Sequence, residues 1–138
     1  MCRLTKKDDI PYINAVVDVC NLVSIRYALP VAAFDLHSLK GAVTVQFATG
    51  NEIFTPLGGT APEHPEPGEV IFADEAGVVV ARRWCWRQSE ESAAQESTQE
   101  ALFTIEAQQA GGQPLVDRAL QDLRRLLGEY VGGEYRDQ

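Results

Sequence analysis

Residues 13–36 read I-N-A-V-V-D-V-C-N-L-V-S-I-R-Y-A-L-P-V-A-A-F-D-L, and this stretch decides how the chain is interpreted. In its first half, apolar side chains recur at spacings of three and four, at Ile13, Val16, Val17, Cys20 and Val23. Such spacing predicts the buried face of an α-helix. The helix is expected to end before Pro30, because the residue preceding a proline disfavours the helical region. Residues 31–40 are then predicted to form a compact, turn-rich link.

After Gly41 the apolar pattern changes to a period of two, which is typical of half-buried strands. Strands are predicted at residues 43–47, 70–73, 78–86 and 101–107. Residues 52–55 are expected to pair back on the first of these strands as a hairpin. Residues 56–68 are rich in proline and glycine, which predicts a loop. Residues 88–99 are polar and rich in glutamate, which predicts a surface loop.

Residues 113–130 carry their leucines on one side of a helix, so an amphipathic helix is predicted to close the chain. The order of elements is therefore a helix, a run of strands and a second helix. This order predicts an α+β fold, with a mixed or barrel-like β-sheet core and a helix near each end of the chain.

Two motifs lie within residues 13–36: V-D-V-x-N, which ends at Asn21, and P-x-x-A-F-D-L, which begins at Pro30. Three further segments follow in order, at residues 39–41, 68–75 and 98–107. Together they resemble the editing module, also called the B-three/B-four or tRNA-binding domain, of the phenylalanyl-tRNA synthetase beta subunit. That module carries V-D-V-T-N followed by P-x-H-A-F-D-L at nearly the same separation. The resemblance covers roughly residues 11–108.

The resemblance implies a domain that binds the aminoacylated 3′ end of a tRNA and hydrolyses a mismatched amino acid in trans. It implies no covalent nucleophile, no metal and no other cofactor. Asn21 would hold the ester or the terminal ribose, and Glu106 would read the amino-acid side chain, so these two are the candidate catalytic residues. The alternatives are an Asn21 bonded to the neighbouring turn and a Glu106 that lies on the surface or in an ion pair with Arg82 or Arg83.

Two positions depart from the pattern of the family. Ala32 stands where the synthetase has the histidine of P-x-H-A-F-D-L, and Cys20 stands where it has threonine. Alanine has no proton to transfer and no hydrogen bond to donate. His37 lies on another part of the turn and does not replace the missing imidazole. Ala32 is therefore a candidate substrate-binding position at which the chemistry of the family is altered.

The segment Arg82, Arg83, Trp84, Cys85, Trp86, Arg87 resembles the R-R-W-x-W-R of freestanding relatives, whereas the synthetase has a small, glycine-rich segment. On a strand, Arg82, Trp84 and Trp86 would share one face. Tryptophan beside arginine suits stacking on a base or an aminoacyl ring, with arginine reaching phosphate. Arg82, Arg83, Trp84 and Trp86 are therefore candidate substrate-binding residues. The alternative is that one tryptophan anchors the core and the arginines pair with acidic residues.

With 138 residues, the chain is predicted to form a single domain over residues 1–138 that resembles the synthetase editing domain. In freestanding relatives of this module, further elements usually precede the V-D-V-x-N helix, which here begins near residue 13. We therefore expect either a shortened member or a fragment that lacks N-terminal elements. Missing elements would leave apolar surface exposed, which favours self-association.

The net charge of −8 argues against a broad basic surface for nucleic acid, so contact with tRNA is expected to be local, at its 3′ end. The same balance disfavours a DNA-binding role. No apolar run approaches the roughly 20 residues of a membrane span, and a cytoplasmic protein is expected. Three cysteines and two histidines indicate neither a disulfide framework nor a metal site, and Cys20 and Cys85 are expected to be packing residues.

Two other functions are compatible with these patterns. One is a non-catalytic module that binds RNA or an amino acid, which Ala32 and the acidic balance favour. The other is an interaction protein that keeps only the fold. The sequence does not indicate the oligomeric state.

Overall fold

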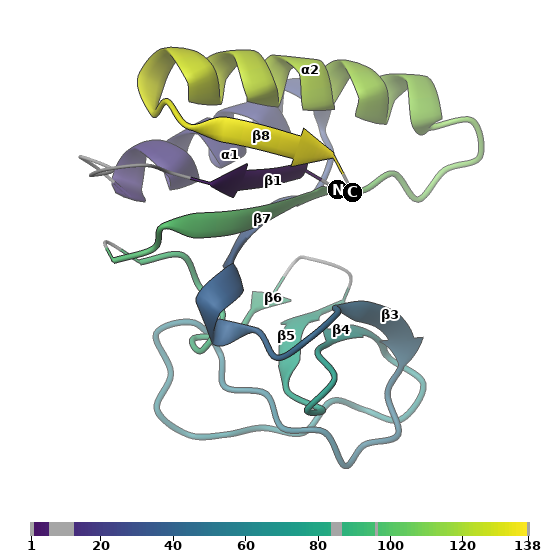
Figure 1. Ribbon diagram of the computed structural model, residues 1–138. Helices are drawn as coiled ribbons and strands as arrows, with labels where there is room; N and C mark the ends of the chain where they lie inside the picture. The colour runs from purple at the N-terminus through teal and green to yellow at the C-terminus, as the bar shows by residue number, and fades with distance from the viewer. Residues whose placement is uncertain (1, 6–12, 84–86, 96, 138) are drawn as a thin grey trace. The chain divides into compact units, whose positions relative to one another are not determined.

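The structure is a computed structural model that describes residues 2–5, 13–83, 87–95 and 97–137 (Figure 1). In chain order its elements are β1 (Cys2–Thr5), α1 (Ile13–Tyr27), β2 (Val31–Asp35), the 3-10 helix η1 (Leu36–Ser38), β3 (Thr44–Phe47), β4 (Val70–Ala73), β5 (Val79–Arg82), β6 (Arg87–Gln88), β7 (Glu100–Ile105), α2 (Gln113–Tyr130) and β8 (Glu134–Asp137). They group into two compact units. The first unit comprises Met1–Asp35 and Ala94–Gln138, and the second unit comprises Leu36–Ala93.

The first unit contains a four-stranded antiparallel sheet in the order β2-β7-β1-β8, with α1 and α2 packed against it (Figure 1). Val23 of α1 and Leu123 of α2 join Ala33 of β2 and Phe103 of β7 in one apolar core. Because successive side chains of a strand point to opposite faces, Ala32 points to the other face of the sheet, away from this core.

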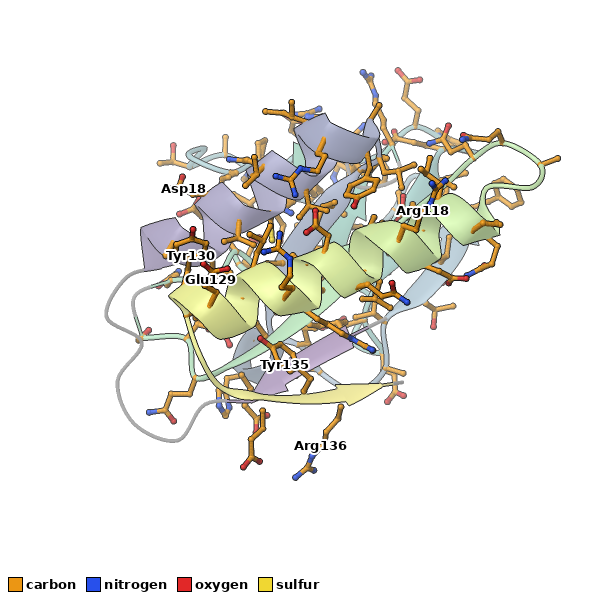
Figure 2. The ribbon with its side chains drawn as sticks, turned by 90° about the horizontal axis from the view of Figure 1, so that it is seen from above. Asp18, Arg118, Glu129, Tyr130, Tyr135 and Arg136 are labelled. Atoms are coloured by element: carbon orange, nitrogen blue, oxygen red, sulfur yellow. The ribbon has the colours of Figure 1, made fainter. Side chains whose placement is uncertain are left out.

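Polar contacts hold α2 to its neighbours in the first unit. Asp122 of α2 accepts an ion-paired hydrogen bond from Arg26 of α1, and the Tyr27 hydroxyl donates to the same carboxylate at 3.3 Å. Figure 2 shows Tyr135 of β8 beside α2, where its hydroxyl donates to the carbonyl oxygen of Arg124 at 3.1 Å. These contacts fix both the helix pair and the last strand against α2.

The two ends of the chain form neighbouring strands of this sheet. In β1, Cys2 lies opposite Phe103 of β7 on one side and opposite Asp137 of β8 on the other. No strand was predicted from the sequence at residues 2–5 or 134–137. Both segments are short and mix polar with apolar residues, so their strand state depends on pairing partners far away in the chain.

The predicted link at residues 31–40 is wrong in its first half. Residues 31–35 form β2, which pairs along its whole length with β7, from Val31 opposite Ile105 to Asp35 opposite Ala101. Ala32 and Phe34 are 1% and 0% exposed. A strand buried on both faces shows no polar alternation, so a run of apolar residues carried no strand period to detect.

The first predicted helix is confirmed at Ile13–Tyr27, but its buried face differs by one position. Val19 is buried and Val17 is 41% exposed, whereas Val16, Cys20 and Val23 are buried as expected. The second predicted helix is confirmed at Gln113–Tyr130.

The second unit contains a four-stranded antiparallel sheet in the order β3-β4-β5-β6 over a small core. The strands β3 and β4 confirm two predictions, although all the residues of β3 are exposed rather than half-buried. The expected hairpin at residues 52–55 is wrong. Ile53 instead forms a parallel bridge to Val78, and Phe54 forms an antiparallel bridge to Glu63.

The long strand predicted at residues 78–86 is also wrong. β5 ends at Arg82, and Arg83 has a φ of +50°, in the left-handed region that a strand does not use. Arg87 of β6 then lies opposite Arg82. The predicted alternation of side chains between the two faces of a strand therefore ends at Arg82. Trp84 and Trp86 lie outside the described residues.

The prediction that residues 88–99 form a surface loop is wrong for three polar side chains, which are buried. Ser89, Ser92 and Thr98 are 0%, 1% and 4% exposed. The Ser89 and Ser92 hydroxyls lie 2.7 Å apart, and the Thr98 hydroxyl donates to Asp35 at 2.8 Å. Hydrogen bonds allow these small polar side chains to be buried. Their partners cannot be identified from the composition of the segment.

The predicted α+β class is confirmed: a helix lies near each end of the chain, and the strands form two open antiparallel sheets. That residues 1–138 behave as one domain stays a prediction. Within the described part of the chain, neither helix has the length and apolar character needed to cross a bilayer.

Candidate functional site

Ala32 and Glu106, far apart in the sequence, are brought together by the pairing of β2 with β7. Ala32 lies opposite Thr104, and the Glu106 backbone N–H donates to the Pro30 carbonyl at 3.2 Å. The ladder therefore extends by one residue pair beyond β7. Because side chains alternate along a strand, Ala32, Thr104 and Glu106 share the sheet face that points away from the helices.

This face is closed around Ala32 and more open at Glu106. Ala32 is 1% and Thr104 is 3% exposed, whereas Glu106 is half-buried with its Oε2 atom inaccessible to solvent. Glu106 is therefore not an ordinary surface glutamate. A carboxylate at such a depth needs hydrogen-bond donors around it, since unpaired burial of its charge is costly.

Thr104 is a functional candidate that the sequence analysis did not name. Its hydroxyl stands directly opposite Ala32, the position at which the family histidine is missing. A hydroxyl both donates and accepts a hydrogen bond. The available signal was its position two residues before Glu106, which puts the two side chains on one face of any strand.

Asn21 comes from a different element. It lies on the exposed side of α1, while Val19, Cys20 and Val23 face the core. Its amide is therefore open to solvent, and the sheet pairing that joins Ala32 to Glu106 does not involve it. The grouping of the two catalytic candidates, Asn21 and Glu106, in one site stays a prediction.

Cys20, which replaces the family threonine, is a core residue. It is 5% exposed, and its burial raises the pKa of the thiol to about 12. A thiol with that pKa stays protonated at neutral pH and is a poor nucleophile. For Cys20, the predicted packing role is confirmed.

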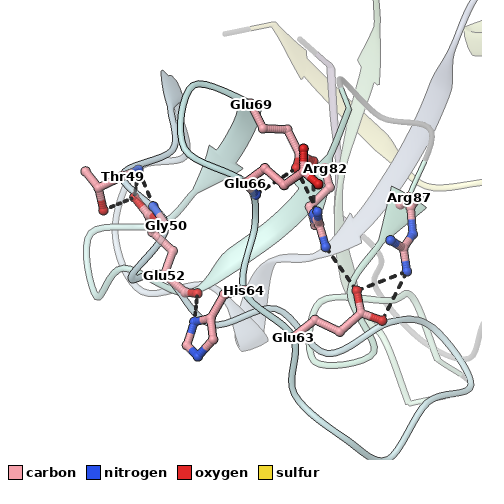
Figure 3. Close-up of polar contacts among 9 residues, drawn as sticks. All are labelled: Thr49, Gly50, Glu52, Glu63, His64, Glu66, Glu69, Arg82 and Arg87. Carbon is pink, nitrogen blue, oxygen red and sulfur yellow. Dashed lines mark hydrogen bonds and ion pairs between the residues drawn. The ribbon is translucent and has the colours of Figure 1, made fainter.

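Arg82 is held by carboxylates of its own unit (Figure 3). Its Nε donates to Glu69 Oε1 at 2.9 Å, its Nη2 to Glu69 Oε2 at 2.7 Å, and its Nη1 to Glu63 Oε2 at 3.0 Å. The guanidinium also lies 5.3 Å from the centroid of the Phe54 ring. The hydrogen bond from Arg82 lowers the pKa of Glu69, and the same bond raises the pKa of Arg82.

The arginine–tryptophan segment therefore divides into parts with different surroundings. Arg82 is 4% exposed and fits the alternative in which the arginines pair with acidic residues. Arg87 joins the same cluster, 3.3 Å from Glu63 Oε2. Arg83 is exposed, whereas Arg82 is buried and Arg87 is half-buried, so Arg83 is the most exposed of the described arginines of the segment.

The Asp74-Glu75 pair, directly after β4, accepts hydrogen bonds from backbone N–H groups. Asp74 Oδ2 accepts the Lys40 N–H at 3.1 Å, and its Oδ1 accepts two N–H groups of its own turn. Glu75 Oε1 accepts the Ala42 N–H at 3.2 Å. Two of the segments that carried the family resemblance, at residues 39–41 and 68–75, are therefore hydrogen-bonded to each other.

The family profile that matches this chain is the B3/4 domain, over residues 2–111. The chain belongs to the B3/4 domain family. The phenylalanine–tRNA ligase beta subunit of Fusobacterium nucleatum is 40% identical over 63 residues, which is 46% of this chain and 8% of that subunit. The corresponding subunit of Shewanella oneidensis is 30% identical over 98 residues, 71% of this chain and 12% of that subunit.

Among solved structures, this B3/4 domain is similar to an N-terminal fragment of the phenylalanyl-tRNA synthetase beta subunit from Pyrococcus horikoshii. The TM-score is 0.77 with 15% sequence identity, over 98% of this chain and 45% of the fragment. At that identity the match shows the fold alone. The resemblance read from the motifs is confirmed, and the chain spans only a small part of the curated relatives that it matches.

Proposed function

We propose that this B3/4 domain binds the aminoacylated 3′ end of a tRNA and hydrolyses a mismatched amino acid in trans. The observation that carries the proposal is the pairing of β2 with β7, which sets the altered position Ala32, the Thr104 hydroxyl and the Glu106 carboxylate on one sheet face. The matched relatives are subunits of a ligase that acts on tRNA. The proposed substrate implies a cytoplasmic protein.

Glu106 would read the amino-acid side chain through its carboxylate, in the part of the face that is still open to solvent. A carboxylate that is partly desolvated discriminates strongly between a side chain that donates a hydrogen bond and one that does not. Asn21 would hold the ester or the terminal ribose with its exposed amide.

The hydrolysis needs an oriented water molecule. The water oxygen attacks the ester carbonyl carbon, the bond from that carbon to the ribose oxygen breaks, and the leaving ribose oxygen takes up a proton from the water to become a hydroxyl. Thr104 would hold the water or the carbonyl oxygen in place of the missing histidine, because its hydroxyl is opposite Ala32. The rate gain would come from positioning and from electrostatic stabilisation of the transition state.

Charge limits the proposed contact to a short part of the tRNA. The net charge of −8 argues against an extended phosphate-binding surface. Arg83, exposed on the second unit, is the arginine of the Arg-Trp segment available for a phosphate, since Arg82 is already bound by Glu69.

The test is release of amino acid from a panel of mischarged tRNAs, with the phenylalanyl-tRNA synthetase as positive control. We expect hydrolysis of one or two species, reduced by Glu106→Gln and by Asn21→Ala but not by Asn51→Ala, an exposed asparagine of the second unit. Release no faster than the uncatalysed rate for every tRNA would refute the hydrolytic function. Retained binding of aminoacyl-tRNA in that case would indicate the non-catalytic binding module.

A further inference from the structure

The strand β3 is an open edge of the second unit's sheet, since β4 is its only neighbour among the described strands. The hydrogen-bond pattern shows which groups face the open side. The Ala48 N–H donates to the Glu69 carbonyl at 2.7 Å, and in the same register Gln46 forms the next hydrogen-bonded pair with β4. Hydrogen-bonded and non-hydrogen-bonded pairs alternate, so the N–H and C=O groups of Val45 and Phe47 point to the open edge.

The side chains of the same two residues are exposed. Val45 is 46% and Phe47 is 73% exposed. They lie on one face of the sheet, where Val45 is opposite Phe72 and Phe47 is opposite Val70 of β4. The open edge therefore combines backbone N–H and C=O groups that β4 does not bind with a row of exposed apolar side chains, Val45 and Phe47.

This edge lacks the usual protection against pairing. Exposed edge strands commonly carry charged residues, prolines or bulges that prevent another chain from adding to the sheet. Residues 41–51 contain no charged residue and no proline, in a chain whose net charge is −8. The nearest carboxylates are those of Glu75 and Glu52, which bind the N–H groups of Ala42 and Thr49 at the two ends of the segment. Between these ends, β3 itself places no like charges opposite each other when two copies pair.

We propose that β3 pairs antiparallel with β3 of a second copy, around a two-fold axis at Gln46. Val45 then lies opposite Phe47 of the second copy, and each such pair exchanges both of its N–H···O=C bonds. The apolar row becomes continuous, from Phe72 through Val45 to Phe47 and Val70 of the second copy.

The occupant is a second copy because the open segment is short and complementary to itself. The Thr49 N–H, next along the edge, is already bonded to the Glu52 carboxylate at 2.9 Å. Free edge groups are thus limited to the segment around Val45 and Phe47, and a two-fold pairing uses the same segment from both copies. Salt should strengthen the dimer, since it screens the repulsion between two acidic chains.

Sedimentation over a concentration series tests the pairing with single substitutions. Phe47→Lys is expected to weaken dimerisation by about tenfold or more, because it removes the apolar contact and places like charges across the axis. Ile25→Lys, which alters a residue of α1 that is 81% exposed, is the matched control and should leave the dimer unchanged. Circular dichroism and melting temperature confirm that both variants are folded.

Cross-linking tests the register. Gln46→Cys should form an intermolecular disulfide under mild oxidation, because the two Cα atoms across the axis are expected about 4.5 Å apart, within disulfide range. Thr44→Cys is the control on the same face, since in this register its symmetry mate lies several residues away. Cys2 and Cys85 are replaced by serine in both variants, and Cys20 is buried.

A dimer that weakens in Phe47→Lys, together with a cross-link in Gln46→Cys and none in Thr44→Cys, supports the pairing. A wild-type chain that is monomeric throughout the concentration series overturns it, as does a dimer that survives Phe47→Lys. A cross-link in Thr44→Cys instead of Gln46→Cys rejects the register around Gln46. None of these results depends on tRNA hydrolysis.

Discussion

Arg82 and Glu69 form a two-bonded ion pair within the second unit, in which Nε and Nη2 of the guanidinium each donate to one carboxylate oxygen. The side chains are only 5% and 11% exposed. Such a planar pair is geometrically specific, and neither partner is readily replaced in it. The pair gives Arg82 a structural role in this unit.

Arg82→Ala is therefore expected to destabilise the protein by about 3 kcal/mol, since it leaves the Glu69 carboxylate buried without its partner. Arg87→Ala is the matched control, because Arg87 is 36% exposed and its ion pair with Glu63 is longer, at 3.3 Å. We expect less than about 1 kcal/mol for the control. Urea denaturation measures both. Equal losses for the two variants would contradict the structural role of Arg82.

The turn at residues 49–52 is expected to lose stability in acid, because the Glu52 carboxylate holds it together. Its carboxylate accepts the N–H groups of Thr49 and Gly50 at 2.9 and 3.0 Å and the Thr49 hydroxyl at 3.0 Å (Figure 3). These bonds together lower the pKa of Glu52 from 4.5 to about 2, and the backbone bond from Thr49 has the largest effect. The folded-state pKa is depressed, so this stabilisation is fully present above pH 4.5 and is lost as the pH falls toward 2.

Glu52→Gln should accordingly lower the stability by about 1 kcal/mol at pH 7, where charged hydrogen bonds are replaced by neutral ones. The difference from wild type should shrink as the pH falls below 4.5, because protonation of Glu52 in the unfolded wild-type chain then favours unfolding, and the folded carboxylate becomes neutral only near pH 2. Melting temperatures of both proteins between pH 7 and pH 2 provide the measurement. A difference that stays constant over that range would show that the carboxylate charge is not responsible.

Gly41 should not tolerate a side chain. Its φ is +76°, and a Cβ at this position would lie 2.2 Å from Glu75 Oε2. Gly41→Ala therefore combines left-handed backbone strain with displacement of the carboxylate that binds Ala42, and a loss of about 2 kcal/mol is expected.

The matched control for Gly41→Ala is Gly68→Ala. Gly68 has a φ of +84° with open space around it, so its substitution measures the backbone strain alone. The loss in Gly41→Ala should exceed that in Gly68→Ala by chemical denaturation. If the two losses were the same, the contact with Glu75 would be unimportant for stability.

Cys20 should resist alkylation. Burial raises its thiol pKa to about 12, so the thiolate that reacts is scarce at pH 8. Mass spectrometry after iodoacetamide treatment, with Cys2 and Cys85 replaced by serine, should show a labelled Cys20 only after denaturant is added. Rapid labelling of the folded protein at pH 8 would place this thiol outside the core.

Thr104 should affect activity through its hydroxyl if the proposed deacylation is correct. Thr104→Val keeps the shape of the side chain and is expected to lower the rate of deacylation by about tenfold or more. Thr104→Ser retains the hydroxyl and should retain most of the rate. Both rates are read from the same mischarged-tRNA assay, with melting temperatures to confirm folding. Equal rates in the two variants would remove Thr104 from the proposed mechanism.

The helices were predictable because their signal is local. In residues 113–130 the leucines repeat along one side over the full length of α2, and both ends of the helix agree with the prediction. The strand β2 was not predictable in this way, because both of its faces are buried. The end of β5 shows a second limit. The apolar residues 78–81 predict a strand, but the sequence does not indicate that Arg83 adopts a positive φ and ends it.

The candidate site was predictable residue by residue but not as an arrangement. The motifs identified Asn21, Ala32 and Glu106 through their resemblance to the family. Thr104 became a candidate only once its position opposite Ala32 was known. Arg82 fitted a phosphate-binding role as well as an ion pair until Glu69 and Glu63 were found against it.

The sequence by itself determined the α+β class, the two helices and the membership of the B3/4 family, because periodicity and motifs depend on residues that are near one another in the chain. Tertiary structure alone decided that β1 and β8 join the sheet, that Thr104 faces Ala32, and that Arg82 binds Glu69. Strand register and charge partners depend on backbone groups and side chains from distant segments, and only the folded chain brings these within hydrogen-bonding distance.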